Sequence, residues 1–247
     1  MTLAPNTQDG TGRLNIFRGE QRGRTRLGWL DSSHSFSFGR HMDPDRMGYR
    51  ALRVINDDVI APGGGFGEHP HADMEIMTWV LSGALRHGDS LNNSELLRPG
   101  ELQRMTAGRG IRHSEFNASQ DEPVHLLQVW IEPSERGLAP AYGQRAFPAQ
   151  GRRGRWQTLA SGRAAESGGE AFSIAQDASL RVAELEASSS LTLGVEPRRF
   201  GYLHVATGLV MLDGTALAAG DAAEVAGPAE LALVGVEPAQ VLAFDLA

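Results

Sequence analysis

The 247-residue chain contains no cysteine and no lysine. Without cysteine it can form no disulfide, no thiol nucleophile and no cysteine-ligated iron–sulfur cluster. Without lysine it can form no Schiff base with a substrate and has no lysine general base, since all 23 basic residues are arginines. These absences exclude covalent catalysis through either side chain.

Long hydrophobic runs are also missing. No stretch reaches the roughly 18 consecutive apolar residues of a membrane-spanning helix, and the N-terminal region is polar and contains no apolar run of signal-peptide type. We therefore expect a cytoplasmic protein that does not contact membranes. The formal net charge of −7 and the scattered arginines argue against direct binding of nucleic acid.

What the chain does contain is a series of short apolar stretches rich in Val, Ile, Leu and Trp, separated by clusters of Gly, Pro, Asn and Asp. This alternation is typical of antiparallel β-structure, and helical periodicity is missing. We therefore predict an all-β fold. The clearest strand candidates are residues 51–55, 75–81, 100–105, 125–131, 180–186, 190–195, 202–206 and 241–245.

Two short histidine motifs point to a metal site: His-Pro-His at 69–71 and His-Ser-Glu at 113–115. Each places two ligand-type side chains at positions i and i+2, which share one face of a β-strand because successive side chains point to opposite faces. Two such strands facing each other would direct three imidazoles and one carboxylate at a single ion. The predicted metal ligands are His69, His71, His113 and Glu115.

This donor set also indicates what kind of metal site to expect. Three nitrogens and one oxygen are of borderline softness and suit iron, nickel, copper, manganese or zinc better than calcium or magnesium. A closed structural zinc site would usually include cysteine, which this chain lacks. A metal that can reach five or six coordination would keep room for a substrate or dioxygen, so we predict a catalytic site.

The sequences around these motifs resemble a known family. Residues 63–83 (GGGFGEHPHADMEIMTWVLSG) and 100–117 (GELQRMTAGRGIRHSEFN) are similar to the two motifs of the cupin superfamily and most closely to those of pirin, and residues 28–38 and 52–60 also look pirin-like. The resemblance covers nearly the whole chain and is strongest from Gly28 to Ile131. It implies two cupin barrels in tandem, each a double-stranded β-helix or jelly roll, of which only the first binds metal.

The resemblance also bears on the metal ligands and on the domains. Matched position by position, the metal ligands of the family fall on the same four residues that the spacing indicates. Many cupins take their carboxylate ligand from the first motif, here Glu75, but the pirin-like pattern favours Glu115 and leaves Glu75 as a supporting or pocket group. We place the metal-binding barrel in residues 1–148, a glycine-rich passage at 149–169, and a barrel without metal ligands at 170–247.

The remaining candidate residues have simpler explanations. We expect five histidines to be surface residues or hydrogen-bonded core residues, with His125 nearest to being an exception because it begins a strand predicted beside the site; the five are His34, His41, His87, His125 and His204. Six apolar residues could line an aromatic-substrate pocket, although core packing is favoured for each: Met74, Met77, Trp79, Met105, Leu127 and Trp130.

The favoured function is that of the short bacterial pirin-like proteins that the chain resembles most, quercetin 2,3-dioxygenase. The expected reaction opens the central ring of a flavonol-like aromatic substrate with O2, with iron(II) as the expected metal and Glu115 as the catalytic base. Copper, nickel, cobalt, manganese and zinc stay open as alternatives. A metal- or redox-sensing protein that regulates a transcription factor or metabolic enzyme by binding it is the second interpretation, and a hydrolase or isomerase with a redox-inactive ion is the third.

Overall fold

The computed structural model describes residues 14–163 and 169–247, and this part of the chain is built from β-strands. Its two helical turns are short 3₁₀ helices, η1 (Gly19–Gln21) and η2 (Ala149–Gly151), and it contains no α-helix. The all-β prediction is therefore confirmed. Within the same residues, no helix has the length and apolar character needed to cross a membrane.

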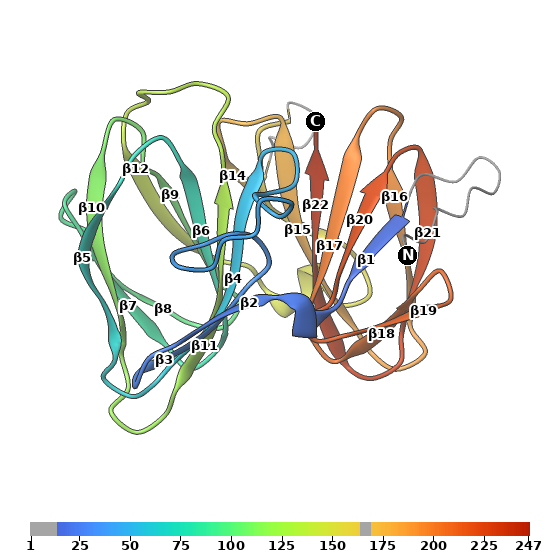
Figure 1. The fold of residues 1–247 in the computed structure, drawn as a ribbon, viewed down its shortest axis with the longest axis horizontal. Coiled ribbons are helices and arrows are strands. Elements are labelled where there is room, and N and C mark those ends of the chain that lie inside the picture. The colour runs from blue at the N-terminus through green and yellow to red at the C-terminus, as the bar shows by residue number, and fades with distance from the viewer. Residues whose placement is uncertain (1–13, 164–168) are drawn as a thin grey trace.

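The first barrel consists of two antiparallel sheets that face each other, seen in blue to green in Figure 1. The large sheet has the strand order β12 (Ala141–Ala146), β9 (Glu101–Thr106), β6 (Glu75–Ser82), β11 (Val124–Ile131), β4 (Leu52–Ile60), β3 (Leu30–His34) and β2 (Gly23–Arg26). The small sheet has the order β5 (Gly65–His71), β10 (Ile111–Asn117), β7 (Leu85–Asp89) and β8 (Ser94–Leu97). Both metal-site motifs lie in the small sheet.

The second barrel repeats this design, which confirms the prediction of two cupin barrels in tandem. Its large sheet has the order β1 (Leu14–Phe17), β20 (Ala222–Ala226), β17 (Phe200–Thr207), β22 (Ala239–Leu246), β15 (Ala178–Leu185), β13 (Gln157–Ser161) and β14 (Phe172–Ser173). Its small sheet has the order β16 (Ser190–Val195), β21 (Ala229–Gly235), β18 (Leu209–Leu212) and β19 (Thr215–Ala218).

All eight strand candidates lie in strands; the ends differ by at most two residues, except that β4 continues five residues beyond the predicted 51–55. The segment 149–169 is less irregular than expected, because β13 lies within it and pairs with β15 of the second barrel. Glycines at both ends of β13 conceal this short strand in the sequence. The strand β1 also pairs with β20, so the first strand among the described residues belongs to the second barrel's sheet. The proposed domain limits stay a prediction.

The two large sheets pack against each other in the middle of the molecule (Figure 1). Met77 and Trp79 of β6 and Leu127 of β11 share one buried cluster with Leu180 of β15 and Phe244 of β22. The indole N–H of Trp79 also donates to Oε1 of Gln240 at 2.7 Å. Strand β6 is therefore buried on both faces, one toward the barrel interior and one toward the second barrel. This explains why its sequence, EIMTWVLS, is mostly apolar and does not alternate.

His204 of β17 is fully buried in the second barrel, and neither of its ring nitrogens has a hydrogen-bond partner. Burial lowers the pKa of His204 to about 3; the charge of Arg22 acts in the same direction, whereas Asp57 and Asp221 oppose it. The folded protein therefore keeps this imidazole neutral at pH values where the unfolded chain protonates it.

We predict that His204 contributes to acid sensitivity. As the pH is lowered from about 6 to about 4, the unfolded chain binds a proton at His204 that the folded chain does not bind. Because of this residue alone, the free energy of unfolding therefore falls by up to about 1.4 kcal/mol for each pH unit. Urea unfolding of the wild type and His204→Leu across this range should show a shallower pH dependence for the variant. Identical slopes would contradict the assignment.

Candidate metal centre

Strand β10 directs His113 and Glu115 into the first barrel. Ile111, His113 and Glu115 are buried, whereas the neighbouring Arg112 and Phe116 are exposed. The alternation follows from the strand geometry, in which every second side chain shares a face. The His-Ser-Glu motif therefore presents both of its ligand-type side chains on one face of the strand.

The partner strand β5 runs antiparallel to β10, and their register places His69 directly opposite His113 and His71 opposite Ile111. The register shifts between His113 and Glu115, so Glu115 lies opposite Phe66. The step from His113 to Glu115 thus pairs with three steps in β5, so the extra residue of this bulge lies in β5. The pairing brings the three histidines together and leaves Glu115 beside Phe66.

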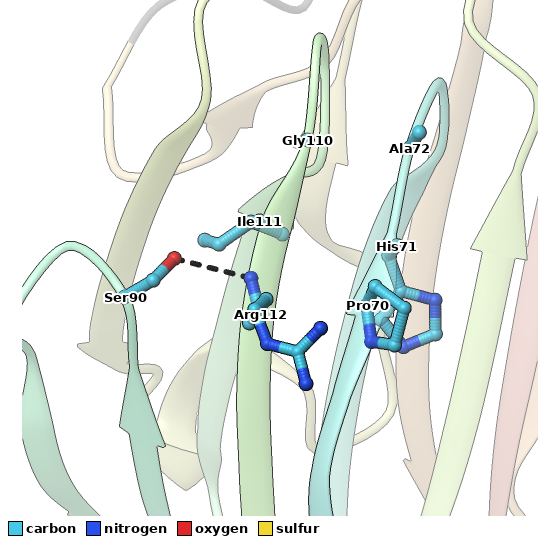
Figure 2. Close-up of a pocket in the computed structure, with 7 residues that line it drawn as sticks. All are labelled: Pro70, His71, Ala72, Ser90, Gly110, Ile111 and Arg112. Carbon is cyan, nitrogen blue, oxygen red and sulfur yellow. Dashed lines mark hydrogen bonds between the residues drawn. The ribbon is translucent and has the colours of Figure 1, made fainter.

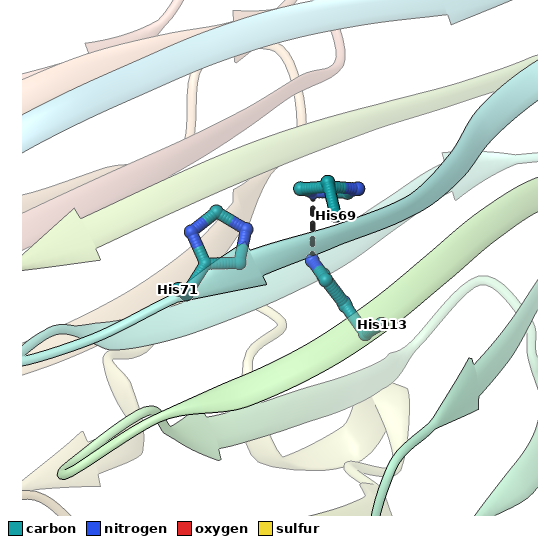
Figure 3. A group of neighbouring side chains, drawn as sticks. All are labelled: His69, His71 and His113. Atoms are coloured by element: carbon teal, nitrogen blue, oxygen red, sulfur yellow. Dashed lines mark hydrogen bonds between the residues drawn. The ribbon is translucent and has the colours of Figure 1, made fainter.

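Figure 3 shows the rings of His69 and His71 from β5 and His113 from β10 turned toward one another. The ring centroids lie 4.5 to 4.9 Å apart. One nitrogen from each residue lies within 4.8 Å of the other two, and Nε2 of His69 is 3.0 Å from Nε2 of His113. We call these three residues the histidine trio. Three convergent imidazoles form a donor set suited to a transition-metal ion.

The backbone orients one member of the trio. Nδ1 of His69 lies 2.8 Å from the carbonyl oxygen of Gly67, to which it can only donate. This contact leaves Nε2 of His69 with a lone pair that faces His113. Metal-binding histidines commonly donate their other N–H to a carbonyl in this way.

Two members of the trio are held in the neutral form that binds metal. Burial, together with the charges of neighbouring histidines, lowers the pKa of His71 to about 4 and that of His113 to about 3. Both imidazoles are therefore unprotonated at neutral pH, and only an unprotonated imidazole can donate a lone pair to a cation.

Glu115 lies deeper in the same barrel. Its carboxylate is buried and accepts hydrogen bonds from Nε2 of Gln128 at 2.6 Å and from Oγ1 of Thr78 at 3.3 Å. Burial raises the pKa of Glu115, whereas the nearby His87, His69 and His71 oppose the increase. Its ligand atom does not join the histidine trio but forms a second cluster with those of His87 and His113, again within 4.8 Å of one another.

His87 is a residue that the sequence analysis did not place at the site. It is fully buried on β7, opposite Glu115 in the pairing of β7 with β10. The signal was present in the sequence, because His87-Gly88-Asp89 has the same i, i+2 spacing as the two motifs that were recognised.

Glu75 belongs to neither cluster. Its buried carboxylate accepts hydrogen bonds from Oγ1 of Thr106 at 2.8 Å and from the backbone N–H of Ala175 at 3.1 Å. Because Ala175 lies in the loop between β14 and β15, Glu75 ties the rim of the first barrel to the second. The Glu75 carboxylate therefore has a structural role, which is to hold this loop against the first barrel.

The other histidines of the sequence analysis lie away from the trio. His125 does not join either cluster, and its Nε2 lies 2.6 Å from Oδ1 of Asp57, so it is a hydrogen-bonded residue, as expected for these five histidines. His34 is a hydrogen-bonded core residue, as expected, with Asn56 and Thr25 as partners at 2.8 Å.

Of the six apolar residues considered for a pocket, three belong to the core between the barrels: Met77, Trp79 and Leu127. Trp130 lies beside the trio instead, with its ring 4.9 Å from that of His71 in an edge-to-face arrangement. An open cavity of about 440 Å³ adjoins the trio, and His71 is one of its lining residues. The residues around it, shown in Figure 2, are Pro70, His71, Ala72, Ser90, Gly110, Ile111 and Arg112.

Comparison with known proteins agrees with this architecture. A family model for pirin matches residues 17–131, and a model described as the quercetinase C-terminal cupin domain matches residues 153–246. A quercetin 2,3-dioxygenase of Escherichia coli K12 is 42% identical over 94% of this chain and 98% of that protein. The chain belongs to the pirin family. A pirin-like protein of Caulobacter vibrioides is 42% identical over 89% of this chain and 94% of that protein.

Pirin relatives of known structure include one with a bound metal. The crystal structure of the bacterial pirin YhhW from E. coli in complex with nickel(II) superposes with a TM-score of 0.87, at 39% identity and with 94% of this chain and 98% of that chain covered. A cupin-type metal site in the first barrel of the present chain is consistent with this relative and with the clusters of ligand atoms.

We predict that the two buried glutamates differ in their effect on metal content. Glu115→Gln should reduce the metal bound by purified protein, because it replaces an anionic oxygen beside His113 with a neutral amide. Glu75→Gln is the matched control and should retain the wild-type content, since its partners are Thr106 and Ala175. Elemental analysis of both variants measures the difference, and metal loss in Glu75→Gln alone would reverse the assignment.

Proposed function

We propose that this pirin is a metal-dependent dioxygenase of the quercetin 2,3-dioxygenase type, with a flavonol-like substrate and O2. The observation that supports it most directly is the histidine trio, one member of which, His71, also lines an open cavity. The name of the E. coli relative supports the substrate class, because that protein matches over 94% of this chain.

In this proposal His69, His71, His113 and Glu115 hold the ion. The donor set fits a divalent transition metal, because three nitrogens of the trio converge within 4.8 Å and Nδ1 of His113 is buried without a partner. When bound, such an ion polarises a coordinated hydroxyl group and mediates reaction with dioxygen. Iron(II) is the metal we propose for the cell, and the nickel(II) complex of the E. coli relative indicates that the family fold accepts other metals.

Glu115 is the proposed base for the acidic 3-hydroxyl group of the flavonol. Its carboxylate is buried near the trio, and burial raises its pKa, which favours proton uptake at neutral pH. Gln128 and Thr78 hold the carboxylate by donating to its two oxygens, so its position is fixed before substrate arrives. A pre-positioned base needs little reorganisation in the reaction.

Trp130 provides an aromatic surface beside His71. The indole of Trp130 contacts His71 on one side and lies 5.5 Å from the ring of Phe38 on the other. Flat aromatic rings pack favourably against such side chains. A planar substrate bound beside His71 would therefore pack against these aromatic rings next to the metal ligands.

The test is to mix iron-loaded protein anaerobically with quercetin and then admit O2. In the proposed reaction both oxygen atoms enter the ring-opened product and one ring carbon leaves as carbon monoxide, so oxygen consumption and carbon monoxide release should be equal. His69→Ala should lose both together with its metal, and His125→Ala, which changes a histidine outside both clusters, should keep its metal and activity.

A metal-loaded wild type that neither consumes oxygen nor releases carbon monoxide would overturn the dioxygenase proposal. Such a protein would be examined by pull-down in its reduced and oxidised forms. A partner bound in only one of these states would favour the metal- or redox-sensing interpretation.

A further inference from the structure

A second cluster of ligand atoms lies beneath the histidine trio. It consists of His87, His113 and Glu115, which are all buried, whereas His69 and His71 of the trio are only partly buried. The two clusters share His113. We call the cluster of His87, His113 and Glu115 the inner cluster.

The ring of His87 is oriented as in a metal ligand. Its Nε2 lies 3.0 Å from Oδ2 of Asp89, while its Nδ1 is buried and has no hydrogen-bond partner. A carboxylate that accepts the N–H of one ring nitrogen leaves the lone pair on the other, and metal-binding histidines are commonly held in this way. The free lone pair of His87 therefore belongs to Nδ1.

Asp89 is itself fixed in place. Its carboxylate accepts hydrogen bonds from the side chain of Asn93 at 2.8 and 3.0 Å and from the backbone N–H groups of Leu91 and Asn93 at 2.9 and 3.0 Å. Burial would raise the pKa of Asp89, but the hydrogen bonds from His87 and Asn93 outweigh this effect and lower it. Asp89 is thus an anionic anchor for His87 at neutral pH.

Packing also fixes the position of His87. Its ring stacks on that of Tyr142 with centroids 4.6 Å apart and an angle of 18° between the planes. The strand register places His87 opposite Glu115, so both side chains point into the barrel from neighbouring strands. A buried, anchored imidazole with an unpartnered nitrogen beside a carboxylate costs free energy unless a cation or proton satisfies it.

We propose that the first barrel offers a single divalent transition-metal ion two overlapping positions: an outer one at the histidine trio with Glu115, and an inner one at His87, His113 and Glu115. The inner set contains two imidazoles and one carboxylate, a combination that binds divalent iron, cobalt or nickel. This inference goes beyond the proposed function and depends only on its metal-binding part. His71 of the outer position lines the cavity, whereas the side chains of the inner position are all buried.

The test removes the outer position and asks whether binding survives. Metal-free His69→Ala/His71→Ala protein is titrated with Co²⁺, and binding is followed by calorimetry and by the visible absorption of the ion. We expect one Co²⁺ per chain to remain bound. Adding Asp89→Asn to this background should weaken binding by about 10–100-fold, because the anchor of His87 becomes a neutral amide.

Adding His87→Phe to the same background should abolish the remaining binding, while the aromatic ring preserves the stacking on Tyr142. His125→Phe is the matched control, because His125 is also bonded to a carboxylate through Nε2 but lies outside both clusters. It should leave Co²⁺ binding unchanged. Circular dichroism and thermal unfolding verify that each variant is folded, and Asp89→Asn serves as the deciding variant if His87→Phe is not.

Each failure has a separate meaning. A folded His69→Ala/His71→Ala protein that binds no Co²⁺, although the wild type does, would overturn the inner position alone. Binding that is insensitive to both Asp89→Asn and His87→Phe would also overturn it, because the ion would then use other ligands. A wild type that binds no Co²⁺ would contradict the metal site of the proposed function as well.

Discussion

The candidate site depends on the antiparallel pairing of β5 with β10. This register sets His69 opposite His113, and the period-two geometry of each strand turns His71 and Glu115 to the same side of the sheet. A slip of one residue in either strand would send its ligands to the outer surface. The backbone hydrogen bonds between these two strands therefore determine whether the barrel has a metal site at all.

The sequence predicts much of this arrangement because the relevant information is local. Spacing within 69–71 and 113–115 is enough to place pairs of side chains on one strand face, and alternation of apolar stretches with turn residues is enough to indicate β-structure. The eight strand candidates lie in strands because they are apolar stretches bounded by turn residues. The resemblance to pirin added the order of the barrels, which no local pattern contains.

The features that escaped prediction depend on residues distant in the sequence. The bulge in β5 places Phe66 rather than Gly67 opposite Glu115, and nothing in the tripeptide 113–115 reveals it. His87 enters the site only because β7 pairs with the other edge of β10. Similarly, Trp79 resembles a pocket residue in sequence, but its face of β6 is covered by a second barrel more than a hundred residues further along the chain.

Among the described residues, both clusters of ligand atoms lie in the first barrel. The second barrel nevertheless contributes to the stability of the first. It shields the apolar outer face of β6 and β11, and it receives the strand β1 from the opposite end of the chain. Proteolysis near residue 150 would consequently not release two independent domains. The two fragments would stay associated through the pairing of β1 with β20 and through the apolar interface between the large sheets. The N-terminal fragment alone would expose the apolar outer face of β6 and β11, and such an exposed patch promotes self-association.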